Sequence, residues 1–129
     1  MIELNPNIEK RDEIIFGEYD KKAYSGETRH FDNLSFEVLQ QLLDLNFIDP
    51  DERQNECPAV KEIFQFMEKY PGYTAHGYAV EKNQSGYRIT LTGVKKDGDL
   101  DSLDELKDFA DLFDHADELH VENLYCWFD

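Results

Sequence analysis

A chain of 129 residues, 40% of them hydrophobic, can close one core and leaves little material for a second, so we predict a single domain over 1–129. The 29 Asp and Glu against 13 Lys and Arg give a formal net charge of −16. Such a field repels phosphates and disfavours direct binding of nucleic acid or of an anionic membrane surface. A basic protein is a better candidate for the binding partner.

The cysteines and the N-terminal residues indicate the compartment. Cys57 and Cys126 are far apart and lack CxxC spacing, so neither a zinc site nor a disulfide framework is indicated, and we interpret both as reduced thiols. The start, MIELNPNIEKRDE, has no basic region followed by an apolar one, and no run of apolar residues reaches the length of a membrane span. We therefore expect a cytoplasmic protein without a membrane segment.

The N-terminal quarter of the chain carries the weakest structural signal. Residues 1–30 mix charged residues and glycines around one short apolar group, IIF. We expect at most one strand here, near 13–17, in a segment that can be loosely ordered.

Two helices are predicted next. Apolar residues recur at helical spacing over 35–47, and Ser35 can cap the start of that helix. A second amphipathic pattern over 58–70 begins at Pro58, which suits the first turn of a helix, and is stopped by Pro71 and the glycine after it. The two helices can form a hairpin.

The second half of the chain alternates strands with one helix. Aromatic and β-branched residues predict strands over 73–80 and 87–94, joined by a polar loop. Helical spacing of apolar residues from Leu103 onward predicts a helix over 102–115, and a last strand is predicted over 119–127. These elements indicate an α+β fold, with three helices on one face of a small, mainly antiparallel sheet of three or four strands.

One internal run resembles known proteins. The run over 55–94, NECPAVKEIFQFMEKYPGYTAHGYAVEKNQSGYRITLTGV, contains a Pro-headed helix that ends in Tyr-Pro-Gly and leads into a Gly-Tyr strand and a hairpin. In this it resembles a group of uncharacterised small bacterial proteins, some of them encoded on mobile elements. The resemblance brings no active site with it.

The most unusual feature is the acidity of the C-terminal quarter. From Asp97 to Asp129 there are twelve carboxylate side chains and one cation, Lys107. On the helix over 102–115 the carboxylates recur every three or four residues, so we expect most of them on one face, about 5 to 6 Å apart along the axis. Such a face can be merely solvated. It can also bind a basic protein, as an inhibitor or immunity-like protein or as a mimic of nucleic acid.

The C-terminal strand has apolar residues on both of its faces, which is more than one core-facing side requires. The N-terminal IIF group could cover the second face, or aromatic residues there could anchor a partner beside the acidic rim. The candidate partner-binding residues are Asp101, Asp104, Glu105, Asp108, Asp111, Glu118, Tyr125 and Phe128.

The alternative function is binding of a small ligand or a metal ion. The alternation of aspartates from Asp97 resembles the start of an EF-hand loop, but Ser102 stands where that loop needs Gly, and Asp108 replaces its bidentate Glu. No catalytic motif or cofactor motif is present, so we expect a protein that is not an enzyme and assign it no metal and no cofactor. The candidate groups for this alternative are Asp97, Asp99, Asp101, His76, His115 and His120.

Overall fold

The predicted α+β class is confirmed by the computed structural model, which describes residues 3–53, 57–81, 86–96, 102–114, 118–120 and 125–127. Within these ranges the chain forms α-helices, one short 3-10 helix and a five-stranded sheet. In chain order the elements are α1 (Ile8–Phe16), η1 (Lys21–Ala23), β1 (Thr28–Leu34), α2 (Phe36–Asp44), α3 (Val60–Lys69), β2 (Tyr73–Val80), β3 (Ile89–Lys96), α4 (Leu103–Leu112), β4 (Glu118–His120) and β5 (Tyr125–Trp127).

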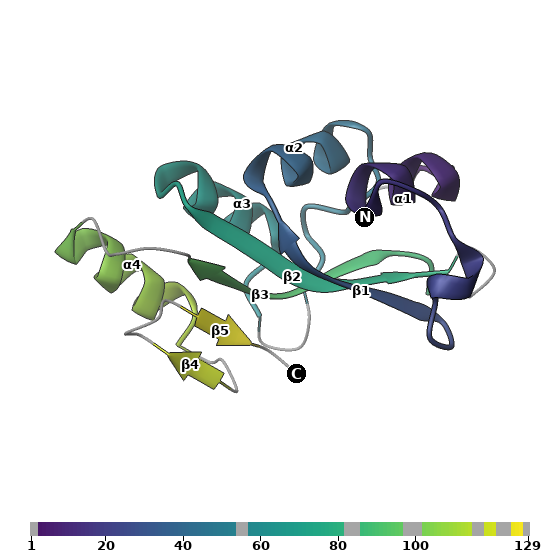
Figure 1. Ribbon diagram of the computed structural model, residues 1–129. Coiled ribbons are helices and arrows are strands. Elements are labelled where there is room, and N and C mark those ends of the chain that lie inside the picture. The colour runs from purple at the N-terminus through teal and green to yellow at the C-terminus, as the bar shows by residue number, and fades with distance from the viewer. Residues whose placement is uncertain are drawn as a thin grey trace.

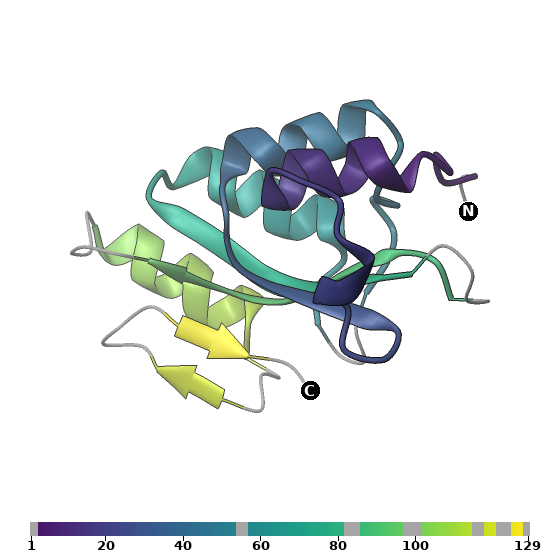
Figure 2. The same ribbon diagram turned by 45° about the vertical axis from the view of Figure 1, so that its right-hand side comes forward.

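Three long antiparallel strands, β1, β2 and β3, form the larger part of the sheet, with β1 at one edge, and the short strands β5 and β4 extend it beyond β3. Helices α1, α2 and α3 lie next to one another over one face of the long strands (Figure 1, Figure 2). Phe109 of α4 and Phe113, which directly follows this helix, pack against Phe66 of α3, with ring centroids 6.1 and 5.6 Å away. The core therefore lies between the helices and one face of the sheet.

Several predicted elements agree with the structure within a few residues. The strand predicted over 73–80 coincides with β2, while α3 and β3 replace the predicted ranges 58–70 and 87–94. α4 is shorter than the predicted helix over 102–115, and Leu103, expected on its apolar face, is 83% exposed.

α2 is also shorter than the predicted helix over 35–47. Ser35 caps its start, because the Ser35 side chain accepts a hydrogen bond from a backbone amide of the first turn. Asn46 has a left-handed backbone conformation (φ 62°), which Asn tolerates better than most residues, so the helix has ended by this point. Phe47 and Ile48 then enter the core from the loop.

The strand predicted near 13–17 is wrong, because this segment belongs to helix α1. Asn7 caps the helix by accepting a hydrogen bond from the Lys10 amide, and Gly17, with φ 86°, ends it. The helical pattern is hard to recognise in the sequence because two residues on the buried side of α1 are charged, Arg11 and Asp12.

The apolar residues near the end of α1 are partly buried beside the main core. Ile14, Ile15 and Phe16 pack against it, and the Phe16 ring lies 6.4 Å from that of Phe31 on β1. Because β1 forms the edge of the sheet opposite β4 and β5, this group does not cover the C-terminal strands as one hypothesis proposed.

Two further features of the sheet differ from the prediction. The segment predicted as one strand over 119–127 forms two short antiparallel strands, β4 and β5, with Leu119 paired to Cys126. Strand β1 was not predicted, because only Phe31 and Leu34 of its seven residues are buried and its register against β2 is irregular between them. An edge strand of this kind lacks the alternation that marks a half-buried strand.

Candidate functional site

Ser102 caps the start of the acidic helix α4, because its side chain accepts a hydrogen bond from the Glu105 amide (3.1 Å). The Glu105 carboxylate itself is fully buried, and it accepts hydrogen bonds from Lys96 Nζ (2.8 and 3.1 Å) and from the Tyr73 hydroxyl (3.0 Å). The prediction that Glu105 lies on an exposed acidic face is therefore wrong. A cation and a hydroxyl from the neighbouring strands satisfy its charge inside the protein.

Asp108, one turn further along α4, also makes contacts within the protein. Its carboxylate accepts hydrogen bonds from the Tyr70 hydroxyl and from Lys69 Nζ, the latter at 2.9 Å. These two hydrogen bonds hold the pKa of Asp108 below its usual range. Glu105 and Asp108 thus attach α4 to the sheet and to α3, and only part of the acidic pattern remains available to a partner.

The other predicted partner-binding residues have different positions. Asp104 and Asp111 are exposed on α4, and Asp114, just beyond its end, is exposed as well. Asp101 and Phe128 lie outside the described residues. Glu118 and Tyr125 belong to β4 and β5, where the structure gives their place in the backbone.

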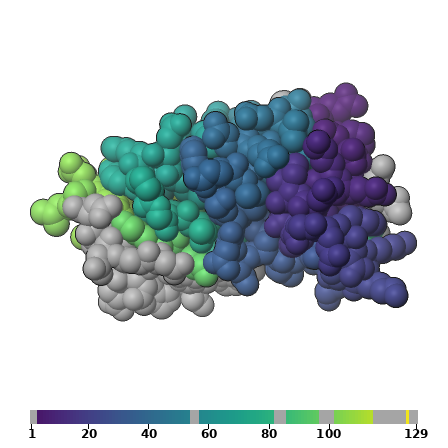
Figure 3. All heavy atoms as spheres, turned by 45° about the horizontal axis from the view of Figure 1, so that its top comes forward, coloured from purple at the N-terminus to yellow at the C-terminus, as the bar shows by residue number. Residues whose placement is uncertain are grey.

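A groove of about 390 Å³ runs between α3 and α4, and we call it the α3–α4 groove. Figure 3 views the helix side of the molecule, with α3 in teal and α4 in light green. Phe66 and Leu112 give the groove an apolar lining, while Asp108 and Asp111 place carboxylates beside it. Such a groove can accept an apolar side chain that is flanked by a cation. Its lining residues are Gln65, Phe66, Lys69, Tyr70, Asp108, Asp111 and Leu112.

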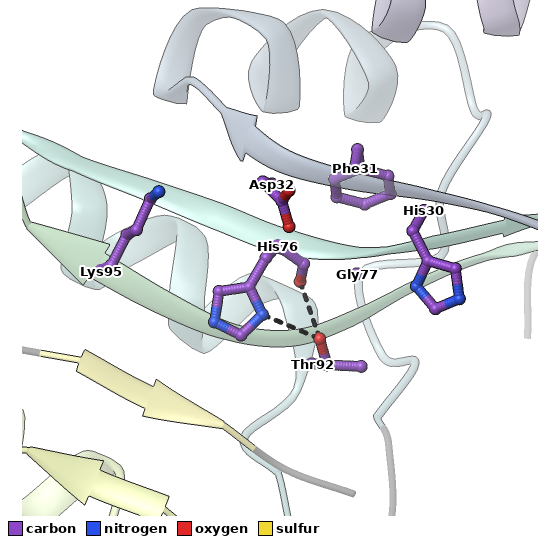
Figure 4. Close-up of a pocket in the computed structure, with 7 residues that line it drawn as sticks. All are labelled: His30, Phe31, Asp32, His76, Gly77, Thr92 and Lys95. Atoms are coloured by element: carbon purple, nitrogen blue, oxygen red, sulfur yellow. Dashed lines mark hydrogen bonds between the residues drawn. The ribbon is translucent and has the colours of Figure 1, made fainter.

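A second hollow, of about 210 Å³, lies on the sheet, and we call it the sheet-face pocket (Figure 4). His30 and His76 point away from the helices there. The pocket lies where the strands are irregular: β1 shifts register after Phe31, and β2 shifts between His76 and Gly77. Such irregularities bend strands and redirect side chains. The lining residues are His30, Phe31, Asp32, His76, Gly77, Thr92 and Lys95.

His76 connects three strands of the sheet. Its Nδ1 lies 2.9 Å from Thr92 Oγ1 on β3, and its Nε2 lies 3.0 Å from the Cys126 carbonyl oxygen on β5. Because that carbonyl can only accept, Nε2 carries a hydrogen and donates it. Burial lowers the pKa of His76, so the ring favours its neutral form.

Gly93 allows β5 to approach this closely. A Cβ atom at this position would lie 2.1 Å from the Cys126 carbonyl oxygen and 2.7 Å from Cε1 of His76. No other residue could occupy the position without moving β5 or the imidazole.

The groups considered for metal binding are only partly described. Asp97, Asp99, Asp101 and His115 lie outside the described residues, and His120 is placed in the backbone of β4. Over the described part of the chain, no three His, Cys, Asp or Glu side chains are grouped so that they could hold a metal ion.

None of the helices in the described part of the chain is long and apolar enough to span a membrane. Both cysteines are buried free thiols, and burial raises the pKa of Cys126 to about 12.

Comparisons with protein-family models, with curated proteins and with solved structures find no match. The resemblance of the run over 55–94 to small bacterial proteins therefore stays a prediction.

The α3–α4 groove was found from the structure alone, since the sequence did not indicate that α3 forms one side of it. Tyr70 belongs to the apolar pattern predicted for this helix, whereas Phe66 was not among its predicted apolar positions, and only the packing of α4 beside α3 places both next to Asp111.

Proposed function

We propose that this protein is a non-enzymatic interaction protein of the cytoplasm that binds a basic segment of another protein in the α3–α4 groove. The observation that supports it is the combination of an apolar lining, Phe66 and Leu112, with the exposed carboxylate of Asp111, while Asp108 in the same lining is paired with Lys69. In a protein with a net charge of −16, this arrangement favours a cationic partner that also carries an apolar anchor.

The burial of Glu105 distinguishes between the forms that such a protein could take. A mimic of nucleic acid needs a regular row of exposed charges, and the α4 row is interrupted by Glu105 and partly neutralised at Asp108. An inhibitor or immunity-like protein needs instead an apolar anchor site with charges at its edge. The groove supports this second form.

The proposal can be tested with defined peptides. The probe is a labelled helical peptide of Lys and Leu, compared with a peptide of equal charge in which Ser replaces Leu, and binding is followed by fluorescence anisotropy. We expect the Lys/Leu peptide to bind more tightly, and added salt to weaken its binding. Asp111→Asn should weaken binding about twofold to fivefold, as expected for one exposed charge pair.

The matched control is Glu18→Gln, which removes one exposed carboxylate far along the chain from the groove. This variant should bind the Lys/Leu peptide as the wild type does. Equal affinity for the Leu and Ser peptides, together with equal effects of both variants, would reduce the interaction to general charge attraction and contradict the proposal.

A second candidate function is the binding of a small polar ligand in the sheet-face pocket. It is favoured by the meeting of charged and polar side chains, Asp32, His76 and Lys95, where two strands lose their regular register. Thermal-shift measurements with small carboxylates, amines and amino acids would test it. A ligand that raises the melting temperature of the wild type but not of Lys95→Met would support it, and no rise with any of them would oppose it.

A further inference from the structure

Helix α3 borders a second groove on its other flank, which we call the α2–α3 groove. It measures about 380 Å³ and lies where the start of α2, the end of α3 and the start of β2 meet. Phe36 and Met67 give it apolar lining, and Glu37 and Glu68 are exposed carboxylates at its side. It therefore has the same combination of apolar surface and negative charge as the α3–α4 groove.

The positions that line the two grooves lie on opposite sides of α3. Gln65 and Lys69, one turn apart, line the α3–α4 groove, whereas Met67 and Glu68 line the α2–α3 groove. At about 100° per residue, these two pairs lie on different flanks of the helix, and the exposed side of α3 forms a ridge between them. The two grooves are thus separated by about the width of one helix, roughly 10 Å.

Charge is also similar on both sides of the ridge. Asp108 and Asp111 line one groove and Glu37 and Glu68 line the other. Among the described residues that line either groove, the only cation is Lys69, which forms a salt bridge with Asp108. A partner that crosses α3 therefore meets carboxylates on both sides and should itself be positively charged.

We propose that the two grooves act together as one docking surface for a basic amphipathic helix that lies across α3, with one apolar side chain in each groove. The inference rests on the proposed function and specifies the partner. On a helix, residues seven positions apart lie on one face, about 10.5 Å from each other, which matches the separation of the grooves.

An extended strand matches this separation less well. Side chains on one face of a strand are spaced by multiples of two residues, that is about 6.6 or 13 Å, and the residue near 10 Å points to the opposite face. A helix with apolar residues seven positions apart is therefore the better occupant.

The test uses three helical peptides of identical composition, rich in Lys and with two Leu residues. The Leu residues stand seven, four or five positions apart, and the affinity of each peptide is measured by fluorescence anisotropy. The spacing of seven should bind about tenfold more tightly than the other two, because only this peptide buries both Leu side chains. Glu37→Gln and Asp111→Asn should each weaken its binding about twofold to fivefold, and the control Glu18→Gln should not.

The outcomes separate this inference from the proposed function. If all three peptides bind equally and Asp111→Asn weakens binding while Glu37→Gln does not, the single α3–α4 groove is the site and the two-groove surface is wrong. If none of the peptides binds more tightly than a Lys/Ser peptide of equal charge, both proposals fail.

Discussion

Two buried ion pairs, each completed by a tyrosine hydroxyl, attach helices to the sheet. Arg11 Nε on α1 lies 2.9 Å from Asp12, and Arg11 also donates to the Tyr24 hydroxyl (2.8 Å), which donates to Asp12. Near α4, Lys96 contacts Glu105 at 2.8 Å, and the Tyr73 hydroxyl donates to the same carboxylate. Burial raises the pKa of both tyrosines, so both hydroxyls remain donors.

The two regions differ in how much charge remains after their internal contacts are made. On α1, Arg11 also donates to the Val80 carbonyl oxygen (3.1 Å), and both members of the ion pair have no exposed surface. On α4, exposed carboxylates such as Asp104 and Asp111 remain beside the satisfied Glu105 and Asp108. The acidity of α4 therefore exceeds what its attachment to the fold requires, and that excess is the part open to a partner.

The largest expected effect is at the Arg11 pair. Arg11→Met leaves the Asp12 carboxylate buried without its cation, which should lower the free energy of unfolding by about 3 to 5 kcal/mol. Urea denaturation measures the loss. The double variant Arg11→Met, Asp12→Leu should lose less, because the buried charge is then absent; equal losses in both variants would contradict the role assigned to the pair.

The Lys96 pair should show a smaller effect, because Lys96 retains slight exposure. We expect Lys96→Met to lower the free energy of unfolding by about 2 to 4 kcal/mol. Amide hydrogen exchange provides the sharper readout, since protection should fall in α4 more than in α1. A uniform loss of protection over both helices would show that this contact is not local to α4.

A third prediction concerns pH and the sheet-face pocket. Because the pKa of His76 is lowered in the folded state, the unfolded chain takes up a proton first as the pH falls through about 6.5. The contribution of neutral His76 is therefore complete above that pH and is lost as the pH falls towards the lower, folded-state pKa. His76→Gln should be less stable than wild type at pH 8, and the difference should shrink at pH 5. A constant difference would contradict the buried neutral ring.

The smallest effects compare two carboxylates on α4. Asp108→Asn should slightly lower the urea midpoint at neutral pH, because it weakens the contacts with Lys69 and Tyr70, whereas Asp111→Asn should leave the midpoint unchanged. The pKa of Asp108 is lowered in the folded state, so its contribution is present above about pH 4 and is lost on acidification. Equal midpoints for the two variants at neutral pH would show that Asp108 has no greater structural role.

The elements with a regular apolar period were predictable, and the contacts between polar groups were not. β2, α3 and α4 follow from the spacing of residues in the sequence, and the start of α2 follows from its capping residue, Ser35. α1 was missed because Arg11 and Asp12 are buried through contacts with residues distant in sequence, such as Val80. For the same reason the sequence did not show that the charge of Glu105 is satisfied inside the protein, because its partners Lys96 and Tyr73 lie on strands whose positions beside α4 only the structure gives.

The most direct test of binding through the α3–α4 groove is a two-dimensional ¹⁵N–¹H NMR titration of the protein with the Lys/Leu helical peptide. We predict chemical-shift changes that concentrate at Gln65, Lys69, Asp111 and Leu112 and that are much smaller at Glu9 and Glu18, which are acidic and exposed on another part of the molecule. Changes of similar size at all exposed acidic residues, or no changes around the groove, would contradict the proposed function.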